Sequence, residues 1–464
     1  MYKKNHLHFV GINGIGMSGI AKILHKEGYT VSGCDLASDK SNVQELIESS
    51  CQISNQHGST ICNDPSISIV VYSSDIAYDN TELVAARKKK IPTVKRAVIL
   101  AEIMRTKFSI GVAGSHGKTT TTSLIAHILI EADFDPTVIV GGVLNNINNN
   151  ARHGVGKYAV VEADESDRSL LLLPVTLGII TNIDFEHTNI YENIDDVAET
   201  FKTYLEQLPF YGKAIISTDD INIAKILPHL SCQTITYGTT NQAQIQAVNI
   251  KLNADNSYFD IIDNKTNSLL GSIYIPMPSM YNVLNAIAAI ATALEIDIPF
   301  RTIAKSLTTF KGIDRRFTYK GTMVTPTVEI FDDYGHHPTE IFNSLITAQR
   351  KTKNKLIVVF QPQRYTRTYH LWDEFVKVFA TSEIDHLILT DIYPANEAPI
   401  ENITTERLAN EIQKLANHMK VQYISFDQNL EKIKEYIEDI IDDNDLVLLL
   451  GAGKINMLAE KLLQ

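Results

Sequence analysis

Residues 114–120 (GSHGKTT) have the residue types that hold the phosphates of a nucleotide. They follow an apolar run, Phe108–Ala113, and precede a stretch of helical character, which is the strand–loop–helix order of phosphate-binding loops. The strict eight-residue pattern fails because Val112 stands where it needs glycine. A shorter loop keeps the chemistry, since its glycines let the backbone wrap phosphates, Lys118 carries a positive charge and the Thr119 hydroxyl suits Mg²⁺. The residues expected around the phosphates are Gly114, Ser115, His116, Gly117, Lys118, Thr119 and Thr120.

Acidic and histidine side chains follow two other strand-like runs of the same region. Glu162 ends the run that begins at Tyr158, and His187 follows the run Leu177–Ile183. The carboxyl ends of parallel strands meet at one edge of a sheet, so these side chains should lie beside the phosphate loop. Mg²⁺ prefers oxygen ligands, and we expect Thr119, Glu162 and His187 around it. Taken alone, each acidic residue is more simply interpreted as a helix cap or a solvated charge. Three such loops at the same sheet edge, however, favour a metal site beside the phosphates.

A second glycine-rich segment, Gly11–Gly19 (GINGIGMSG), lies between the strand-like run His6–Val10 and a helix. A tight turn into a helix N-terminus suits a diphosphate, because free N–H groups and the positive end of the helix dipole face the ligand. Asp35 ends the next strand, where a carboxylate accepts hydrogen bonds from a ribose. The pattern leaves open a dinucleotide, another diphosphate nucleotide or a merely structural turn. Ser73 and Ser74 follow a further strand and either line the same crevice or are ordinary turn residues.

The last third of the chain has three more polar loops after apolar runs. They are residues 332–338 (DDYGHHP), 361–367 (QPQRYTR) and 451–454 (GAGK). Arg364 and Arg367 are three residues apart, so on one helical turn both guanidinium groups face a single carboxylate or phosphate. Each loop also has a simpler interpretation. The arginines could form a solvated helix face, and the adjacent histidines His336 and His337 could make loop or core hydrogen bonds. The glycines of residues 451–454 could form only a tight turn.

These loops must be positioned by the strands and helices around them. Strand-like and helix-like runs alternate along the chain, which is typical of parallel sheets covered on both faces by helices. The expected strands are His6–Val10, Thr30–Cys34, Ile67–Tyr72, Phe108–Ala113, Tyr158–Val161, Leu177–Ile183, Lys213–Ser217, Thr327–Asp332, Leu356–Phe360, His386–Thr390 and Leu446–Leu450. The expected helices include Gly19–Lys26, Thr81–Lys90 and Tyr281–Leu294. Residues 243–275 have the turn signals of a β meander, and Asn145–Asn150 is expected to be a loop.

Length and composition bound the class of protein. The 464 residues correspond to about three domains, and we expect them at residues 1–107, 108–313 and 314–464. A formal net charge of −12 argues against nonspecific binding of nucleic acid. No apolar stretch is long enough to span a membrane, and the glycine-rich N-terminus makes a poor signal peptide. The four cysteines show no zinc-binding spacing, so we expect free thiols in a cytoplasmic protein.

Together, these segments resemble the Mur ligase family over nearly the whole chain. The resemblance rests on residues 11–21 (GINGIGMSGIA), 114–120 (GSHGKTT), 162–167 (EADESD), 315–317 (RRF), 332–338 (DDYGHHP), 360–368 (FQPQRYTRT), 391–394 (DIYP) and 451–453 (GAG). It implies three α/β domains. The N-terminal one is Rossmann-like and holds a UDP-sugar rather than NAD, the central one is a P-loop-type ATPase with a mostly parallel sheet, and the Rossmann-like C-terminal one brings the amino acid.

The activity that the resemblance implies is the ATP-dependent joining of L-alanine to the lactyl carboxylate of UDP-N-acetylmuramate through an acyl phosphate, in peptidoglycan precursor synthesis. ATP and Mg²⁺ are the implied cofactors. The implied catalytic residues are Lys118, Glu162, His187, His336, Arg364 and Arg367, with the metal ion near Thr119, Glu162 and His187. The adenosine is expected near Asn282, Arg316 and Asp333. The UDP-sugar is expected near Gly14, Ile15, Gly16, Met17, Ser18, Asp35, Ser73, Ser74 and Arg152.

Three positions depart from the family pattern: Asn13 stands where glycine is common, Tyr281 precedes Asn282 where histidine is usual, and Gln363 replaces a histidine. The nearest rival activity is that of the recycling ligase of this family, which attaches a tripeptide to the same sugar. The form of residues 11–21 favours addition of alanine. A nicotinamide-dependent oxidoreductase or a purely nucleotide-binding module would leave Arg364 and Arg367 unexplained.

Overall fold

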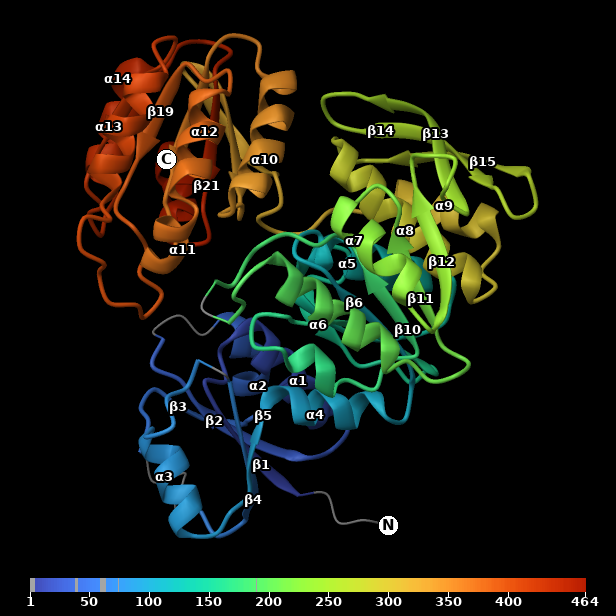
Figure 1. The fold of residues 1–464 in the computed structure, drawn as a ribbon. Coiled ribbons are helices and arrows are strands. Elements are labelled where there is room, and N and C mark those ends of the chain that lie inside the picture. Colours follow the sequence, from blue (N-terminus) through green and yellow to red (C-terminus); the bar gives the residue numbers. More distant parts are fainter. Residues whose placement is uncertain (1–4, 38–40, 59–63, 74, 189) are drawn as a thin grey trace.

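The computed structural model describes residues 5–37, 41–58, 64–73, 75–188 and 190–464, and these form three sheets that succeed one another along the chain. We call the regions built on them the N-terminal, central and C-terminal domains. Figure 1 shows the N-terminal domain below the central domain, and the C-terminal domain above it to the left. The expected class, three α/β domains with mostly parallel sheets, is confirmed.

The N-terminal domain is a parallel five-stranded sheet of order β3-β2-β1-β4-β5. Its strands are β1 His6–Val10, β2 Thr30–Cys34, β3 Gln52–Ser54, β4 Ile67–Tyr72 and β5 Thr93–Lys95, and its α-helices are α1 Ile15–Lys26, α2 Gln44–Glu48, α3 Thr81–Lys88 and α4 Arg96–Met104. Successive side chains of a strand point to opposite faces. Phe9 therefore packs with α1, whereas Val10 packs with Leu83 of α3 on the other face.

The central domain has ten strands in the order β15-β14-β13-β12-β11-β10-β6-β9-β7-β8. They are β6 Phe108–Ala113, β7 Thr137–Leu144, β8 Asn149–Arg152, β9 Tyr158–Glu162, β10 Leu177–Ile180, β11 Lys213–Ser217, β12 Gln233–Gly238, β13 Ile245–Leu252, β14 Ser257–Asp263 and β15 Ser268–Ile275. The α-helices are α5 Lys118–Glu131, α6 Ile194–Glu206, α7 Ile221–Ile226, α8 Met280–Glu295 and α9 Phe300–Thr308. The expected meander is confirmed, because β13, β14 and β15 pair in antiparallel fashion.

The C-terminal domain has six strands in the order β16-β17-β21-β18-β19-β20, and all pairs except β16 with β17 are parallel. The strands are β16 Thr318–Val324, β17 Thr327–Asp333, β18 Leu356–Phe360, β19 His386–Leu389, β20 Lys420–Tyr423 and β21 Leu446–Leu450. The α-helices are α10 Pro338–Lys351, α11 Tyr365–His370, α12 Trp372–Ala380, α13 Thr405–Leu415, α14 Glu431–Ile440 and α15 Leu458–Leu462. In the part of the chain described, no helix is long and apolar enough to cross a membrane.

Two expected elements differ from the structure at points that shape the site. Helix α1 begins at Ile15 rather than Gly19, so Gly16 lies inside the helix, where a Cβ would come within 2.3 Å of the Arg96 guanidinium. Strand β10 ends at Ile180 rather than Ile183. The residues after Ile180 lie against the phosphate loop, where Thr181 Oγ1 donates to the carbonyl of His116 at 2.6 Å.

We expected the asparagine-rich run Asn145–Asn150 to be a loop, but part of it is a strand. Its last two residues begin β8 at the edge of the central sheet. Asn150 is buried, and its side chain donates to Ser18 Oγ of α1 at 3.2 Å. Asn149 Oδ1 accepts from Lys22 Nζ at 2.8 Å. The run therefore attaches the N-terminal domain to the central sheet.

Candidate active site

The loop between β6 and α5 needs glycine at two positions. Gly114 has a φ of 124° and Gly117 a φ of 80°, conformations that side chains rarely adopt. A Cβ on Gly117 would also lie 2.5 Å from Asn285 Oδ1 of α8. The amide of His116 donates to Asn182 Oδ1 at 2.9 Å. Contacts from α8 and from the segment that follows β10 thus shape the loop.

The Lys118 ammonium is the charged centre of this loop. It donates to the carbonyls of Gly114 at 2.6 Å and Ser115 at 2.9 Å, and it lies 2.7 Å from Glu165 Oε1. Burial alone would lower the pKa of Lys118, but nearby carboxylates, foremost Glu165 and then Glu186, raise it above its usual value. The amine is therefore protonated and stands ready to meet an anion.

Glu165 is a site residue that we did not predict. It lies in the 162–167 segment, but a strand-end argument points only to Glu162. Ligand atoms of Glu165, Glu186 and His187 lie within 4.8 Å of one another. Glu165 is 1% exposed, and its Oε2 has no hydrogen-bond partner within the described part of the chain. Two carboxylates, one with an orphaned oxygen, form a donor set that fits a hard divalent cation.

The predicted metal ligands lie at this same sheet edge. Glu162 Oε2 accepts from the amide of Gly141 at 2.9 Å, and Thr119 packs 3.2 Å from where a Cβ of Gly142 would lie. His187 instead approaches Glu165, with 3.5 Å between Nε2 and Oε1. Burial would lower the pKa of His187, but the bond to Glu165 and the charge of the carboxylates raise it.

A second charged cluster joins the phosphate loop to the C-terminal domain. His116 Nε2 lies 2.9 Å from Asp184 Oδ2, and Thr339 at the start of α10 donates to the same oxygen at 2.8 Å. Glu340 Oε1 lies 3.6 Å from His116 Nδ1. Burial disfavours the charged imidazole, but the two carboxylates outweigh it and raise the pKa of His116 to about 10. Asp184 therefore links the phosphate loop to α10.

The predicted residues Arg367 and His336 converge on Glu186, and Arg364 pairs with a different carboxylate. Arg367 Nη2 lies 2.9 Å from Glu186 Oε1, and His336 Nε2 lies 3.5 Å from the same oxygen. Arg364 is held by Glu397, at 3.4 Å. Gln363, which replaces a histidine of the family pattern, accepts a hydrogen bond from Arg367. The cations are positioned by carboxylates that an anionic substrate can replace.

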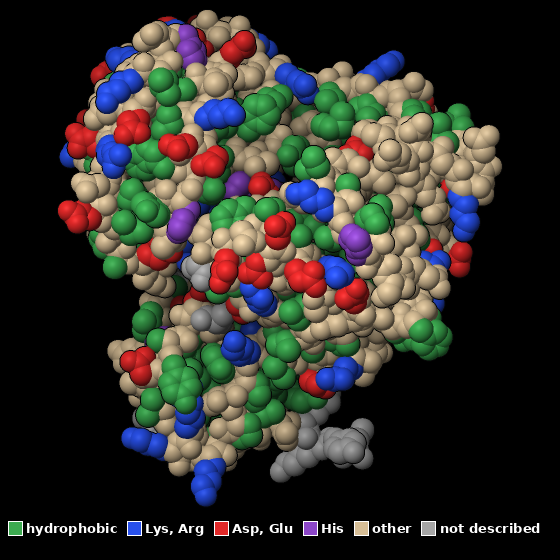
Figure 2. Space-filling view, viewed as in Figure 1, with side chains coloured by type: hydrophobic (Ala, Val, Ile, Leu, Met, Phe, Trp, Pro, Cys, Tyr) green, Lys and Arg blue, Asp and Glu red, His purple; other side chains and the backbone are tan. Residues whose placement is uncertain are grey.

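The side chains of Glu186, His336, Gln363, Arg364 and Arg367 line a cleft of about 620 Å³ to which all three domains contribute. The predicted residues on its wall are Gly14, Ile15, Gly16, Met17, Ser73, His187, His336, Arg364 and Arg367. Two cations that we did not predict, Lys95 and Arg96, lie beside the glycine-rich turn. Lys95 ends the three-residue strand β5, and Arg96 begins the helix that follows it. We did not predict these residues because a strand of three residues is too short to give a recognisable sequence pattern. Figure 2 shows a hollow between the C-terminal and central domains, with histidine and acidic side chains visible in it.

Other residues predicted to contact the UDP-sugar lie elsewhere. Asp35 accepts from the amide of Asn13 at 2.9 Å, and Ser18 donates to the carbonyl of Ile15 at 3.0 Å. Arg152 pairs with Asp135 at 2.5 Å. None of Asp35, Ser18 and Arg152 is on the wall of the cleft. Ser74 lies outside the described residues.

A second cavity, of about 530 Å³, opens beside the loop of residues 114–120. The predicted residues His116, Gly117, Thr120, Asn282, Arg316 and Asp333 line it. Its wall also includes the apolar side chains of Phe310 and Phe317. The Asp333 carboxylate accepts from the amides of Phe317 and Gly335, both at 2.7 Å, so it organises the rim. The size and mixed lining suit a nucleoside.

The sequence matches three models of one protein family. The matches are "Mur ligase family, catalytic domain" at residues 6–108, "Mur ligase middle domain" at residues 112–293 and "Mur ligase, glutamate ligase domain" at residues 315–453. A UDP-N-acetylmuramate–L-alanine ligase of Geobacter sp. strain M21 is 44% identical over 466 aligned residues, covering 100% of this chain and 98% of the relative.

Two solved structures share the fold. A UDP-N-acetylmuramate-alanine ligase of Thermotoga maritima superposes with a TM-score of 0.81 at 24% identity, covering 98% of both chains. A murein peptide ligase of Psychrobacter arcticus gives a TM-score of 0.74 at 21% identity, covering 99% of this chain and 98% of the other.

Proposed function

The chain belongs to the Mur ligase family, and from this premise we propose that it joins L-alanine to the lactyl carboxylate of UDP-N-acetylmuramate at the expense of ATP. The observation that carries the proposal is the segment Asp184–His187, which connects the two cavities. Asp184 bonds to His116 and Thr339 on the wall of the second cavity, whereas Glu186 and His187 line the first. We therefore propose that a nucleotide in the second cavity and an anionic substrate in the first meet across this segment.

In the proposed reaction, the γ-phosphoryl group of ATP passes to the lactyl carboxylate and ADP leaves. The acyl phosphate gives the acyl carbon a good leaving group, which a free carboxylate lacks. The amine of L-alanine then attacks that carbon, loses a proton, and inorganic phosphate departs as the amide forms. Lys118 and the loop amides stabilise charge on the transferring phosphoryl oxygens. Closure of the three-domain cleft excludes water that would hydrolyse the acyl phosphate.

We propose Mg²⁺ at the edge that Thr119, Glu162, Glu165 and His187 form. The orphaned Glu165 oxygen supports this assignment. When bound, the ion supplies positive charge to the phosphate oxygens. Arg364, Arg367 and His336 are proposed to hold the carboxylates and the departing phosphate. The carboxylates of Glu186 and Glu397 keep these cations oriented before the substrates arrive.

The glycine-rich turn and its neighbours are proposed to hold the UDP-sugar. Lys95 and Arg96 provide the positive charge that a diphosphate needs, next to the start of α1. Asn282, Arg316 and Asp333 are proposed to contact the adenosine. We propose the same domain boundaries as in the sequence analysis: residues 1–107 for the UDP-sugar, 108–313 for ATP and 314–464 for the amino acid.

The test is phosphate release from ATP with UDP-N-acetylmuramate and Mg²⁺, adding L-alanine or the tripeptide in turn. We expect release driven by L-alanine, together with ADP and a UDP-sugar heavier by one alanyl residue. Release driven only by the tripeptide would assign the chain to the recycling activity with the same chemistry. No release with either amine, despite ATP binding, would refute a ligase function.

A further inference from the structure

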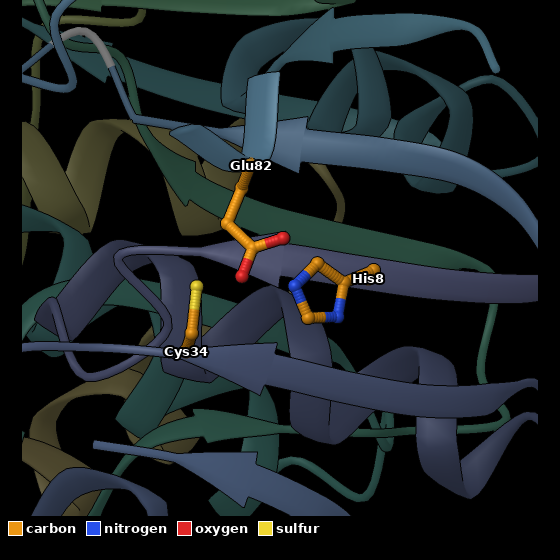
Figure 3. A group of neighbouring side chains, drawn as sticks. All are labelled: His8, Cys34 and Glu82. Atoms are coloured by element: carbon orange, nitrogen blue, oxygen red, sulfur yellow. The ribbon is translucent and has the colours of Figure 1, made fainter. Parts of the chain in front are cut away.

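A buried cluster of metal-ligating side chains lies in the N-terminal domain. His8 comes from β1, Cys34 from the end of β2, and Glu82 from the first turn of α3 (Figure 3). One ligand atom of each lies within 4.8 Å of the other two, and all three residues are 0% exposed. A fourth side chain, His57, approaches from the loop after β3, with its Nδ1 3.1 Å from Cys34 Sγ. We call these four residues the N-terminal cluster.

We propose that the N-terminal cluster is a structural zinc site, and this inference does not depend on the ligase reaction. Zn²⁺ is bound in proteins by thiolate sulfur, imidazole nitrogen and carboxylate oxygen, most often four-coordinate in structural sites. The cluster offers one sulfur, two imidazoles and one carboxylate. Ligand atoms around tetrahedral zinc are roughly 3.5 Å apart, so small side-chain rotations would bring His8, Cys34 and Glu82 to bonding distance. His57, 3.1 Å from Cys34 Sγ, would supply the fourth ligand by turning toward the other two.

The orientation of His8 supports a bound cation. Its Nδ1 is engaged with Ser32 Oγ at 2.9 Å, which leaves Nε2 directed toward Cys34 and Glu82 (Figure 3). Nε2 is buried and has no hydrogen-bond partner among the residues that the structure describes. A buried nitrogen without a partner costs free energy, and a metal ion satisfies it.

The surroundings have the features of an outer coordination shell. Ser32 Oγ also contacts His6 Nε2 at 2.8 Å, so the bond that orients His8 is itself held in place. Glu82 Oε1 accepts from the amide of Gly58 at 2.8 Å. Hydrogen bonds of this kind to ligating imidazoles and carboxylates fix their orientation in known metal sites.

The proposed ion would stabilise the turn that faces the cleft. The carbonyl of Cys34 accepts from the amides of Gly11 at 2.8 Å and Ile12 at 3.2 Å. Fixing the Cys34 side chain therefore fixes the backbone that shapes the glycine-rich turn. The site is closed and lies behind that turn, which suits a structural ion rather than a catalytic one.

The test uses the full-length reduced chain, stripped with a chelator and then given Zn²⁺ or Co²⁺ alone, without nucleotide. We expect one tightly held Zn²⁺ per chain and a rise in the thermal midpoint. With Co²⁺ we expect a near-ultraviolet thiolate-to-metal absorption, which a site without cysteine cannot give. Cys34→Ser should abolish this absorption. Cys51→Ser, which removes a cysteine outside the cluster, should leave it unchanged.

A second variant keeps the result interpretable if Cys34→Ser folds poorly. Glu82→Gln keeps the acceptor for Gly58 but loses the charge, and zinc affinity should fall at least about tenfold. His187→Ala, at the cleft, should keep the zinc. A chain that binds no Zn²⁺, or an absorption that survives Cys34→Ser, would overturn the proposal. So would an unchanged affinity in a folded Glu82→Gln protein.

Discussion

Lys118 and Glu165 form a buried ion pair at the centre of the candidate site. Their charged atoms are 2.7 Å apart, and the carboxylate is almost fully enclosed. Removing one partner of such a pair leaves an uncompensated buried charge, which typically costs about 3–5 kcal/mol. An arriving phosphate would compete with Glu165 for the amine. The pair therefore keeps the site folded and also keeps its cation available.

Lys118→Met is expected to abolish turnover, because the phosphoryl oxygens lose their nearest fixed cation. Loss of one such group typically costs about 10²–10³-fold in rate. Lys213→Met is the matched control, since Lys213 pairs with Glu295 at 2.6 Å and begins β11, at the opposite sheet edge from the phosphate loop. Amino-acid-dependent phosphate release measures both. Wild-type release by Lys118→Met would contradict the assignment of the loop.

His116 should make stability depend on pH in the alkaline range. Its pKa rises to about 10 in the folded chain, compared with about 6.5 when unfolded. The charged imidazole therefore contributes its full stabilisation below pH about 6.5 and loses it as the pH rises through about 10. The pKa of Asp184 is lowered, so that carboxylate stays charged throughout this window.

The measurement compares urea unfolding midpoints of the wild type and His116→Gln at pH about 6.5 and about 9.5. The difference between the two proteins should be larger at the lower pH. A difference that does not change with pH would mean that the imidazole is neutral when buried.

At the scale of elements, strand ends explain what the sequence could and could not predict. Mostly apolar runs identified β6, β11, β18 and β21 at their observed bounds, because buried parallel strands contain few polar residues. In the central sheet, the loops after β6, β9 and β10 lie at one edge, but His187 contacts Glu165 there, whereas Glu162 accepts from the amide of Gly141. The backbone path of residues 162–167 decides which of their side chains contacts Lys118, and a sequence pattern does not specify that path. Glu165 was therefore missed.

Gly117→Ala should be more destabilising than Gly312→Ala. Both glycines have positive φ, 80° and 76°, so each substitution costs about 1 kcal/mol or more in backbone strain. At Gly117 the new Cβ would also meet Asn285 Oδ1 at 2.5 Å, whereas nothing lies within 4 Å at Gly312. The extra cost at Gly117 should be about 1–3 kcal/mol. Urea unfolding of the two variants measures it, and equal losses would show that the contact relaxes freely.

For the whole molecule, the apolar cores show which domains are firmly joined. One core runs from Leu7 of the N-terminal sheet to Ile226 of the central domain. The cores of the C-terminal domain contain only its own residues among those described. It reaches the rest through polar contacts such as Arg367 with Glu186 and Thr339 with Asp184. The sequence predicted three domains but not this asymmetry, because Asn149–Arg152 has no apolar strand pattern.

Polar attachments allow domain movement more readily than a shared apolar core does. Thr339→Val should therefore shift the C-terminal domain toward an open arrangement. The variant removes a hydrogen bond to a charged oxygen, worth about 1.5–3 kcal/mol. Small-angle scattering without ligands should report a larger radius of gyration, and KM for ATP should rise several-fold. Thr352→Val is the control at the other end of α10, because the hydroxyl of Thr352 donates to the carbonyl of Ala348 within the same helix. An unchanged radius in Thr339→Val, with KM also unchanged, would mean that the remaining ion pairs suffice to keep the domain closed.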